Sequence, residues 1–234
     1  MSTCLFLSFQ SRKDASVSDA ELARLDGVLR ATPQLLRALV HLPARASDPY
    51  LDDGPPPQLV LQLYFEELPY LEAALARDGQ LAGLLSRDEF PALADADVTE
   101  QAMLVRAFAV PEPAFSIRPE EPYCTYLVSY EGEAQDQNAW LGHYLGKHIG
   151  HMASLPGLRE LEVYTRLDWI GLLPWTRVNF MQRNKVAFDC ADALTRALNS
   201  PARHRMREDY HGFPLFTGRT THYAMMTRVL RPDA

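Results

Sequence analysis

The sequence predicts an α+β protein in which two copies of one β-α-β-β-α-β unit pack sheet to sheet within a single chain. Three observations lead to this prediction. Distant segments match one another at a nearly constant offset, a proline-rich stretch separates them, and apolar periodicity changes between strand and helix in the same order on both sides. The 234 residues are sufficient for two small domains.

The internal matches fall in one order along the chain. An offset of 123 residues places "PQLLRALVH", from residue 33, on "PGLRELEVY", from residue 156. The same offset aligns "YFEELPYLEAAL" with "AFDCADALTRAL", and an offset of 122 aligns "TEQAMLVR" with "THYAMMTR". These matches indicate a duplicated unit. We therefore divide the chain into a first repeat at 1–110, a proline-rich linker at 111–121 and a second repeat at 122–234.

Periodicity and turn residues predict the same element order in both repeats. For the first repeat we expect strands at 2–10, 35–43, 58–66 and 99–110, and helices at 18–31 and 67–86. For the second we expect strands at 123–132, 158–167, 177–189 and 222–230, and helices at 136–154 and 191–206. This order is the ferredoxin-like fold. Each sheet has one face without helices, so the two repeats are expected to cover each other as an intrachain pseudo-dimeric α+β barrel.

Composition excludes several classes of partner. The net charge of −7 argues against a nucleic-acid partner, because phosphate binding requires a basic surface. No window of 18 uninterrupted apolar residues is present, so we expect no membrane span. The three cysteines show no CxxC spacing, which is typical of a reducing compartment, and we expect a cytoplasmic protein. The sequence also lacks a glycine-rich phosphate loop and a GxSxG motif, which disfavours nucleotide cofactors.

Three of the seven histidines lie in one predicted helix, at His143, His148 and His151. On a regular α-helix His148 falls in the middle of the apolar face, His151 at its edge and His143 on the polar side. His148 is then either a buried imidazole bonded to a backbone carbonyl or a general base, kept neutral by burial. No HExxH motif or third ligand stands nearby, so we expect no metal site.

The histidine segment resembles the EthD family of the dimeric α+β barrel superfamily. The resemblance rests on His143-Tyr144, on His148, on "LPGL" at 155–158 and on Tyr164, with Tyr144 standing where family members often carry Trp. It implies one functional cleft, in the second repeat, because the matching positions of the first repeat are Ala20 and Leu25. The superfamily includes cofactor-free monooxygenases, isomerases, cyclases, decarboxylases and haem enzymes, and its members often dimerise.

The candidate site is therefore built around His148 as the catalytic residue. Its walls are expected on the following strand and in two long loops, at 166–177 and 207–223. The expected substrate-binding residues are Tyr144, Tyr164, Trp169, Trp175, Arg177, Asn179, Tyr210 and Phe213. Secondary candidates are His143, His151 and His211.

Several functions are open at this point. The first is a cofactor-independent enzyme in which His148 moves a proton on a small aromatic-derived or enolisable compound, as an isomerase, cyclase, dehydratase or decarboxylase. The alternatives are a cofactor-free monooxygenase, a non-catalytic ligand-binding or stress-response barrel, and a haem protein. The expected partner is a small molecule, with a homodimer of pseudo-dimers as a further expectation.

Overall fold

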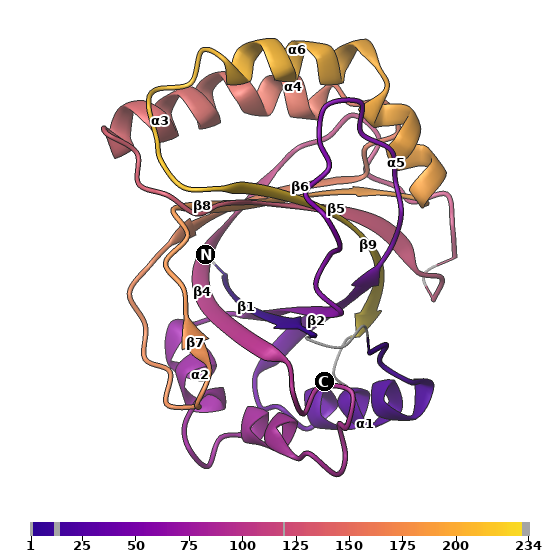
Figure 1. Cartoon of the computed structure of the whole chain (residues 1–234), viewed down its shortest axis with the longest axis vertical. Helices are drawn as coiled ribbons and strands as arrows, with labels where there is room; N and C mark the ends of the chain where they lie inside the picture. Colours follow the sequence, from indigo (N-terminus) through magenta and orange to yellow (C-terminus); the bar gives the residue numbers. More distant parts are fainter. Residues whose placement is uncertain (1, 12–14, 119, 231–234) are drawn as a thin grey trace.

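The computed structural model describes residues 2–11, 15–118 and 120–230. Eight antiparallel strands close into a barrel, and the helices lie on its outside in two layers at opposite sides (Figure 1). The strand order around the barrel is β4-β1-β3-β2-β9-β5-β8-β6, and β6 pairs again with β4. None of the helices in these residues is long and apolar enough to cross a membrane.

The N-terminal half contributes four of the strands and one helical layer. Its helix α1 begins after Ser18, whose hydroxyl accepts from the Glu21 backbone N–H while the Glu21 carboxylate accepts from Ser18 N–H. The predicted helix at 67–86 is interrupted at Gly79, where a Cβ would lie 2.5 Å from the carbonyl oxygen of Ala73. The elements are β1 (Thr3–Gln10), α1 (Asp19–Arg30), β2 (Leu35–Pro43), β3 (Leu59–Phe65), α2 (Leu68–Ala74), the 3-10 helix η1 (Gln80–Leu85) and β4 (Asp97–Phe108).

The C-terminal half departs from expectation in two elements. The predicted strand at 177–189 is two strands, of which the first, two residues long, pairs in parallel with β4. The predicted helix at 191–206 is also two, because Pro201 has no N–H to continue the first helix and begins the second. The elements are β5 (Tyr123–Tyr130), α3 (Gln137–His143), the π-helical turn η2 (Tyr144–His148), α4 (Ile149–Ala153), β6 (Glu160–Arg166), β7 (Thr176–Arg177), β8 (Gln182–Phe188), α5 (Ala191–Leu198), α6 (Pro201–Tyr210) and β9 (Thr220–Leu230).

The two halves join along two antiparallel strand pairs. Strand β2 pairs with β9 from Ala38–Leu230 to Pro43–Met225, and β4 pairs with β6 from Met103–Arg166 to Phe108–Leu161. These pairs leave the barrel without a free edge. The predicted α+β barrel is confirmed, whereas the duplication of one unit and the domain boundaries at 110 and 122 stay predictions.

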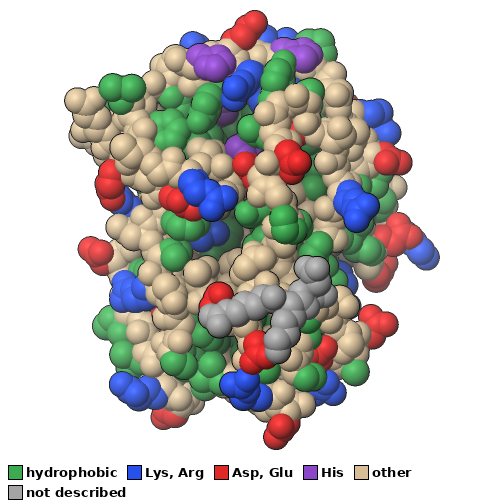
Figure 2. Space-filling model, viewed as in Figure 1, with side chains coloured by type: hydrophobic (Ala, Val, Ile, Leu, Met, Phe, Trp, Pro, Cys, Tyr) green, Lys and Arg blue, Asp and Glu red, His purple; other side chains and the backbone are tan. Residues whose placement is uncertain are grey.

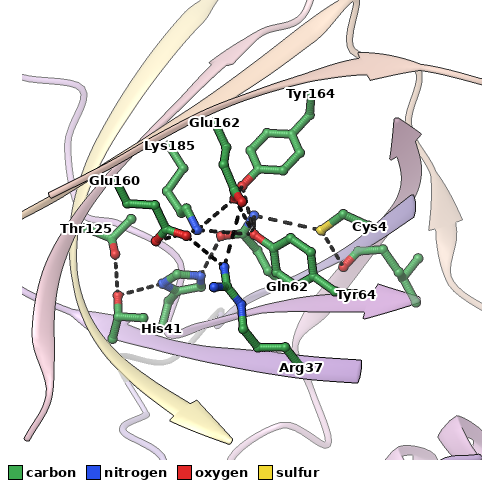
Figure 3. A network of polar contacts seen from close by, with 12 residues as sticks. Cys4, Arg37, His41, Gln62, Tyr64, Thr125, Glu160, Glu162, Tyr164 and Lys185 are labelled. Carbon is green, nitrogen blue, oxygen red and sulfur yellow. Dashed lines mark hydrogen bonds and ion pairs between the residues drawn. The ribbon is translucent and has the colours of Figure 1, made fainter. Parts of the chain in front are cut away.

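The barrel interior is polar at one end, around a network of charged side chains (Figure 3). Lys185 on β8 is fully buried, and its Nζ lies 2.8 Å from Glu162 Oε2 and 3.0 Å from Glu160 Oε2. Arg37 on β2 binds Glu160 at 3.0 Å, and Tyr64 donates to Glu162 at 2.7 Å. Burial alone would raise the pKa of Glu162, but Lys185 and Arg37 lower it to about 2, so the carboxylate stays charged.

Removing Lys185 should destabilise the barrel strongly. Lys185→Met leaves Glu162 buried opposite only the half-exposed Arg37, and losing one partner of a buried ion pair costs about 3–5 kcal/mol. Urea unfolding of the two proteins measures the change. As a control, Arg228→Met removes a partly exposed ion pair with Asp26 and should cost about 1 kcal/mol or less. Equal losses in the two variants would contradict a stabilising role for the buried network.

Candidate functional site

A cavity of about 200 Å³ lies outside the barrel, between the sheet of the C-terminal half and its helices. Helices α3, α4 and α6 form the layer above it in Figure 1. Its walls come from β5, β8 and β9 below, from the helices above, and from a loop of the N-terminal half. The chief side chains around it are Leu51, Tyr126, Val128, Tyr130, Tyr144, His148, Met152, Asn184, Val186, Arg203, Arg207, Tyr210 and His222.

His148 reaches this cavity from a π-helical turn. The turn Tyr144–His148 joins α3 to α4 in one continuous helix, and the N–H of Ile149 bonds to the carbonyl of Tyr144, five residues earlier. On a regular α-helix, residues five apart are separated by roughly 140° around the axis. A π turn brings them onto one face instead, because its hydrogen bonds run between residues five apart. His143 and His148 are five apart, so this turn aligns them.

Both histidines bind one carboxylate, Asp209 at the end of α6. His148 Nδ1 lies 2.9 Å from Asp209 Oδ2, and His143 Nε2 lies 3.1 Å from Oδ1. Lys147 Nζ also contacts Oδ1, at 2.8 Å. The Asp209 side chain is 2% exposed, so these three partners replace the water that a carboxylate normally binds. Burial would raise the pKa of Asp209, but the contacts of Lys147 and His148 lower it to about 2.

The protonation state of His148 follows from these contacts. Burial lowers its pKa to about 4 and outweighs Asp209, which acts in the opposite direction, so the imidazole is neutral at pH 7. A neutral imidazole that faces a carboxylate through Nδ1 carries its proton there. Nε2 has no hydrogen-bond partner among residues 2–11, 15–118 and 120–230. Its lone pair is therefore available at the cavity wall.

Aromatic side chains surround the imidazole. The ring of Phe213 stands edge-on to His148, with centroids 4.9 Å apart, and Tyr144 lies 4.9 Å away on the same helix. Asn184 on β8 donates to the Tyr144 hydroxyl at 2.7 Å, while its own Oδ1 is buried without a partner in the described part of the chain. The cavity is thus mostly apolar with a few polar groups near His148, which is typical of small-molecule sites.

The loop at 44–58 carries two acidic anchors from the N-terminal half to this site. Asp48 binds the buried Arg203 of α6 at 2.9 Å, and Asp53 binds His222 of β9 at 2.9 Å. Leu51, between these anchors, lines the cavity. The N-terminal half therefore contributes one wall of a site whose other residues belong to the C-terminal half.

Arg207 is the second arginine at the cavity, and it differs from Arg203. Arg203 donates three hydrogen bonds to the Asp48 carboxylate. Arg207 contacts the rings of Tyr50 and Tyr210, with its guanidinium carbon 5.7 and 5.6 Å from their centroids, and no carboxylate partner is present in the described residues. Its charge is available to an acidic group in the cavity.

Only part of the predicted site is brought together. His148, Tyr144 and Tyr210 line the cavity, and Phe213 and His143 pack beside His148. His143, predicted on the polar side of its helix, is 20% exposed and bonds to Asp209 of α6, which the π turn allows. His151 and His211 are not among the cavity residues, and His211 is exposed.

The other predicted residues lie elsewhere. Tyr164 points into the barrel, where its hydroxyl lies 2.9 Å from that of Tyr64, because alternate residues of a strand face opposite sides of the sheet. Trp169 and Trp175 pack on the apolar core of the N-terminal half, since their loop crosses to that half and Leu172 N–H bonds to Leu75. The remaining two, Arg177 and Asn179, are exposed in the same segment.

Sequence reasoning missed two residues of the proposed mechanism, Asp209 and Arg207. The expected loop at 207–223 begins later than predicted, because α6 continues to Tyr210. Arg203, Met206, Arg207 and Tyr210 recur at helical spacing and all line the cavity, so this periodicity was the available signal. The partnership of Asp209 with His148, 61 residues away, has no local signature.

Metal and haem place different demands on this site. Across the described residues, no group of three or more His, Cys, Asp or Glu side chains is arranged to hold a metal ion. His148 Nε2 could serve as an axial ligand to haem, but about 200 Å³ lies below the roughly 300–1,000 Å³ of a drug-sized ligand site. A haem would therefore not fit among the side chains as they stand.

Comparisons with known proteins identify the fold. No family model matches this sequence, and no curated protein matches it. Among solved structures, an anthrone oxidase-like protein superposes with a TM-score of 0.62 at 14% identity, over 100% of this chain and 94% of its own.

Two proteins described as a "putative monooxygenase" are also similar. The one from Fusobacterium nucleatum has a TM-score of 0.56 at 8% identity, covering 98% of this chain and 92% of its own. The one from Lactobacillus acidophilus has a TM-score of 0.51 at 12% identity, covering 99% and 97%. At such identities the likeness is one of fold, and function has to be argued from the site. The chain shares the fold of these three proteins, a closed antiparallel barrel with helices on its outside.

Proposed function

We propose that this protein is a cofactor-independent enzyme that removes a proton from a small organic compound, with His148 as the general base. The observation that carries the proposal is the bond from His148 Nδ1 to Asp209, which leaves Nε2 without a protein partner at the cavity wall. An imidazole held in this tautomer accepts a proton at Nε2.

The catalytic step uses three groups of this chain. Nε2 of His148 takes a proton from an acidic C–H or O–H of the substrate and becomes an imidazolium. The Asp209 carboxylate stabilises that imidazolium through Nδ1, at 2.9 Å. Arg207 is the group available to the negative charge left on the substrate, as an enolate, phenolate or carboxylate. Return of the proton to another atom completes an isomerase or cyclase reaction. In a dehydratase reaction the imidazolium gives the proton to the departing hydroxyl group, which leaves as water. In a decarboxylase reaction His148 removes the carboxyl O–H proton, the carboxylate loses CO₂, and the imidazolium returns the proton to the carbon that held it.

The cavity limits the substrate class. About 200 Å³ accommodates a single-ring compound rather than a drug-sized one. Tyrosine rings from β5 and the helix, with Val128 and Val186, provide apolar walls that suit an aromatic or aromatic-derived ring. The unpartnered Arg207 favours a compound that carries or develops a negative charge near one end.

The proposal extends to the organisation of the chain. We propose that the C-terminal half is EthD-like, that the two halves are tandem copies of a ferredoxin-like unit, and that the C-terminal copy carries the site. Leu25 supports this asymmetry, because it takes the place of His148 under the 123-residue offset and is buried in the apolar core of the N-terminal half. Association of two such chains is part of the same proposal.

A cofactor-free monooxygenase is the second candidate. Deprotonation by His148 would also activate an electron-rich aromatic for reaction with oxygen, and the enclosed, largely apolar cavity suits such a substrate. The two candidates differ in one measurement, because only the monooxygenase consumes oxygen in step with product. A ligand that binds and is recovered unchanged would instead support a binding protein.

His148→Gln should lower turnover by about 10²–10⁴-fold, the usual contribution of a general base. The substrate is first selected from a panel of single-ring aromatic acids and β-keto compounds by wild-type turnover. His143→Gln is the matched control, since His143 binds the same carboxylate but does not line the cavity. It should retain turnover within about tenfold. Equal losses in the two variants, or none in His148→Gln, would contradict the assignment of His148 as the base.

The pKa of His148 also predicts how stability depends on pH. An unfolded chain binds a proton at this histidine below about pH 6.5, whereas the folded protein does so only below about pH 4. The free energy of unfolding should therefore fall as the pH falls from 6.5 to 4, by roughly 3 kcal/mol for this group. Urea unfolding at pH 7.0 and pH 4.5 should show a smaller decrease in His148→Gln than in the wild type. Asp209 titrates below this pH range and does not contribute to the difference. Identical decreases in the two proteins would mean that folding does not lower the pKa of His148.

A further inference from the structure

The barrel interior contains a second feature, next to the network of Figure 3 and one inward-facing position further along β8, opposite Tyr164 of β6. Arg183 on β8 is 8% exposed, and its side chain points into the barrel, where it contacts the ring of Phe6, on the same face of the strand as Lys185. No hydrogen bond or ion pair of Arg183 occurs within residues 2–11, 15–118 and 120–230, and its Nε is buried without an acceptor. A side chain this deeply buried whose Nε has no acceptor is uncommon in proteins.

The barrel interior around Arg183 carries more positive than negative side chains. Among the described residues, three cations point into the barrel and have no ion pair with a group outside it: Arg37, Arg183 and Lys185. Two carboxylates lie beside them, Glu160 and Glu162. Both carboxylates bind Lys185 and Arg37. Burial lowers the pKa of Arg183 only to about 10, so it remains a cation at neutral pH. Within the described residues, the charge of Arg183 therefore has no carboxylate partner.

The surroundings hold the guanidinium in place without neutralising it. Its central carbon lies 4.7 Å from the ring centroid of Phe6 and 4.5 Å from that of Phe180. Gln101 fixes the backbone of Phe180, because its Nε2 donates to the Phe180 carbonyl at 2.9 Å. Ring faces attract a cation, but they accept no N–H hydrogen bonds in the guanidinium plane. The planar edge of Arg183 is left as an unused donor set.

The molecular surface is hollowed toward the barrel interior in Figure 2, and basic side-chain atoms are visible in the hollow. We propose that Arg183 is the centre of a second ligand site, in the barrel interior, that binds a small carboxylate in line with the guanidinium edge. A carboxylate presents two coplanar oxygens that match two parallel N–H donors. This site is separate from the His148 cavity, because side chains of β8 alternate between the two faces of the sheet and Asn184, the next residue, lines that cavity.

The test follows the Arg183 Nε–H resonance by NMR in the full chain. Sodium acetate and sodium benzoate are the two titrated ligands, and sodium chloride at equal ionic strength is the control. The expected result is a saturable shift with one of the carboxylates and none with chloride. Calorimetric titration with the same carboxylate should show binding about tenfold or more weaker in Arg183→Met. Arg207→Met is the matched control, since Arg207 is the unpaired arginine of the other cavity, and it should leave the Arg183 shift unchanged.

Several results would overturn the second site. One is an Arg183 resonance that does not move, or that moves as much with chloride as with the carboxylates. Another is calorimetric binding unchanged in Arg183→Met or a shift lost in Arg207→Met, because the ligand would then belong to the His148 cavity. The NMR titration uses the wild-type protein, so it shows whether a carboxylate binds at Arg183 even if Arg183→Met fails to fold.

Discussion

Closure of the barrel is the constraint from which the rest of the architecture follows. The pairs β2–β9 and β4–β6 join the two halves, so every strand of the barrel has a neighbour on each side. Side chains on one face of each strand are then enclosed, and those on the other face must be covered by helices. An enclosed charge such as Lys185 is tolerated because Glu160 and Glu162 meet it across the interior.

The two outer faces of the barrel are covered differently, and this difference determines where the candidate site lies. On the N-terminal half, the segment carrying Trp169 and Trp175 crosses from the other half and packs on a continuous apolar core. On the C-terminal half, the loop at 44–58 crosses in the opposite direction, but it is anchored by Asp48 and Asp53 at the rim and leaves a cavity open. Each half therefore completes the surface of the other, and the covering of the C-terminal half leaves the cavity beside His148.

The π turn connects backbone geometry to chemistry. A regular helix through Tyr144–His148 would separate His143 and His148 around the axis, and one carboxylate could not bind both. The wider turn aligns them, with Lys147, on Asp209. Three donors on one buried carboxylate hold it in position, and the carboxylate in turn selects the His148 tautomer. π turns occur often at functional sites, where such local distortion is compensated by packing. Here the compensation is the aromatic cluster around Tyr144 and Phe213.

The sequence alone determined the α+β class, most element positions and the inward direction of His148, because apolar periodicity and turn residues act over a few neighbouring positions. Asp209 could not be found in this way, since its contact with His148 spans 61 residues and depends on where α6 ends. The same holds for Tyr164 and Trp169, whose types suited a ligand site but whose positions were decided by strand alternation and by a loop crossing to the other half. Only tertiary structure decides such contacts, because they depend on how the barrel closes and not on any local pattern.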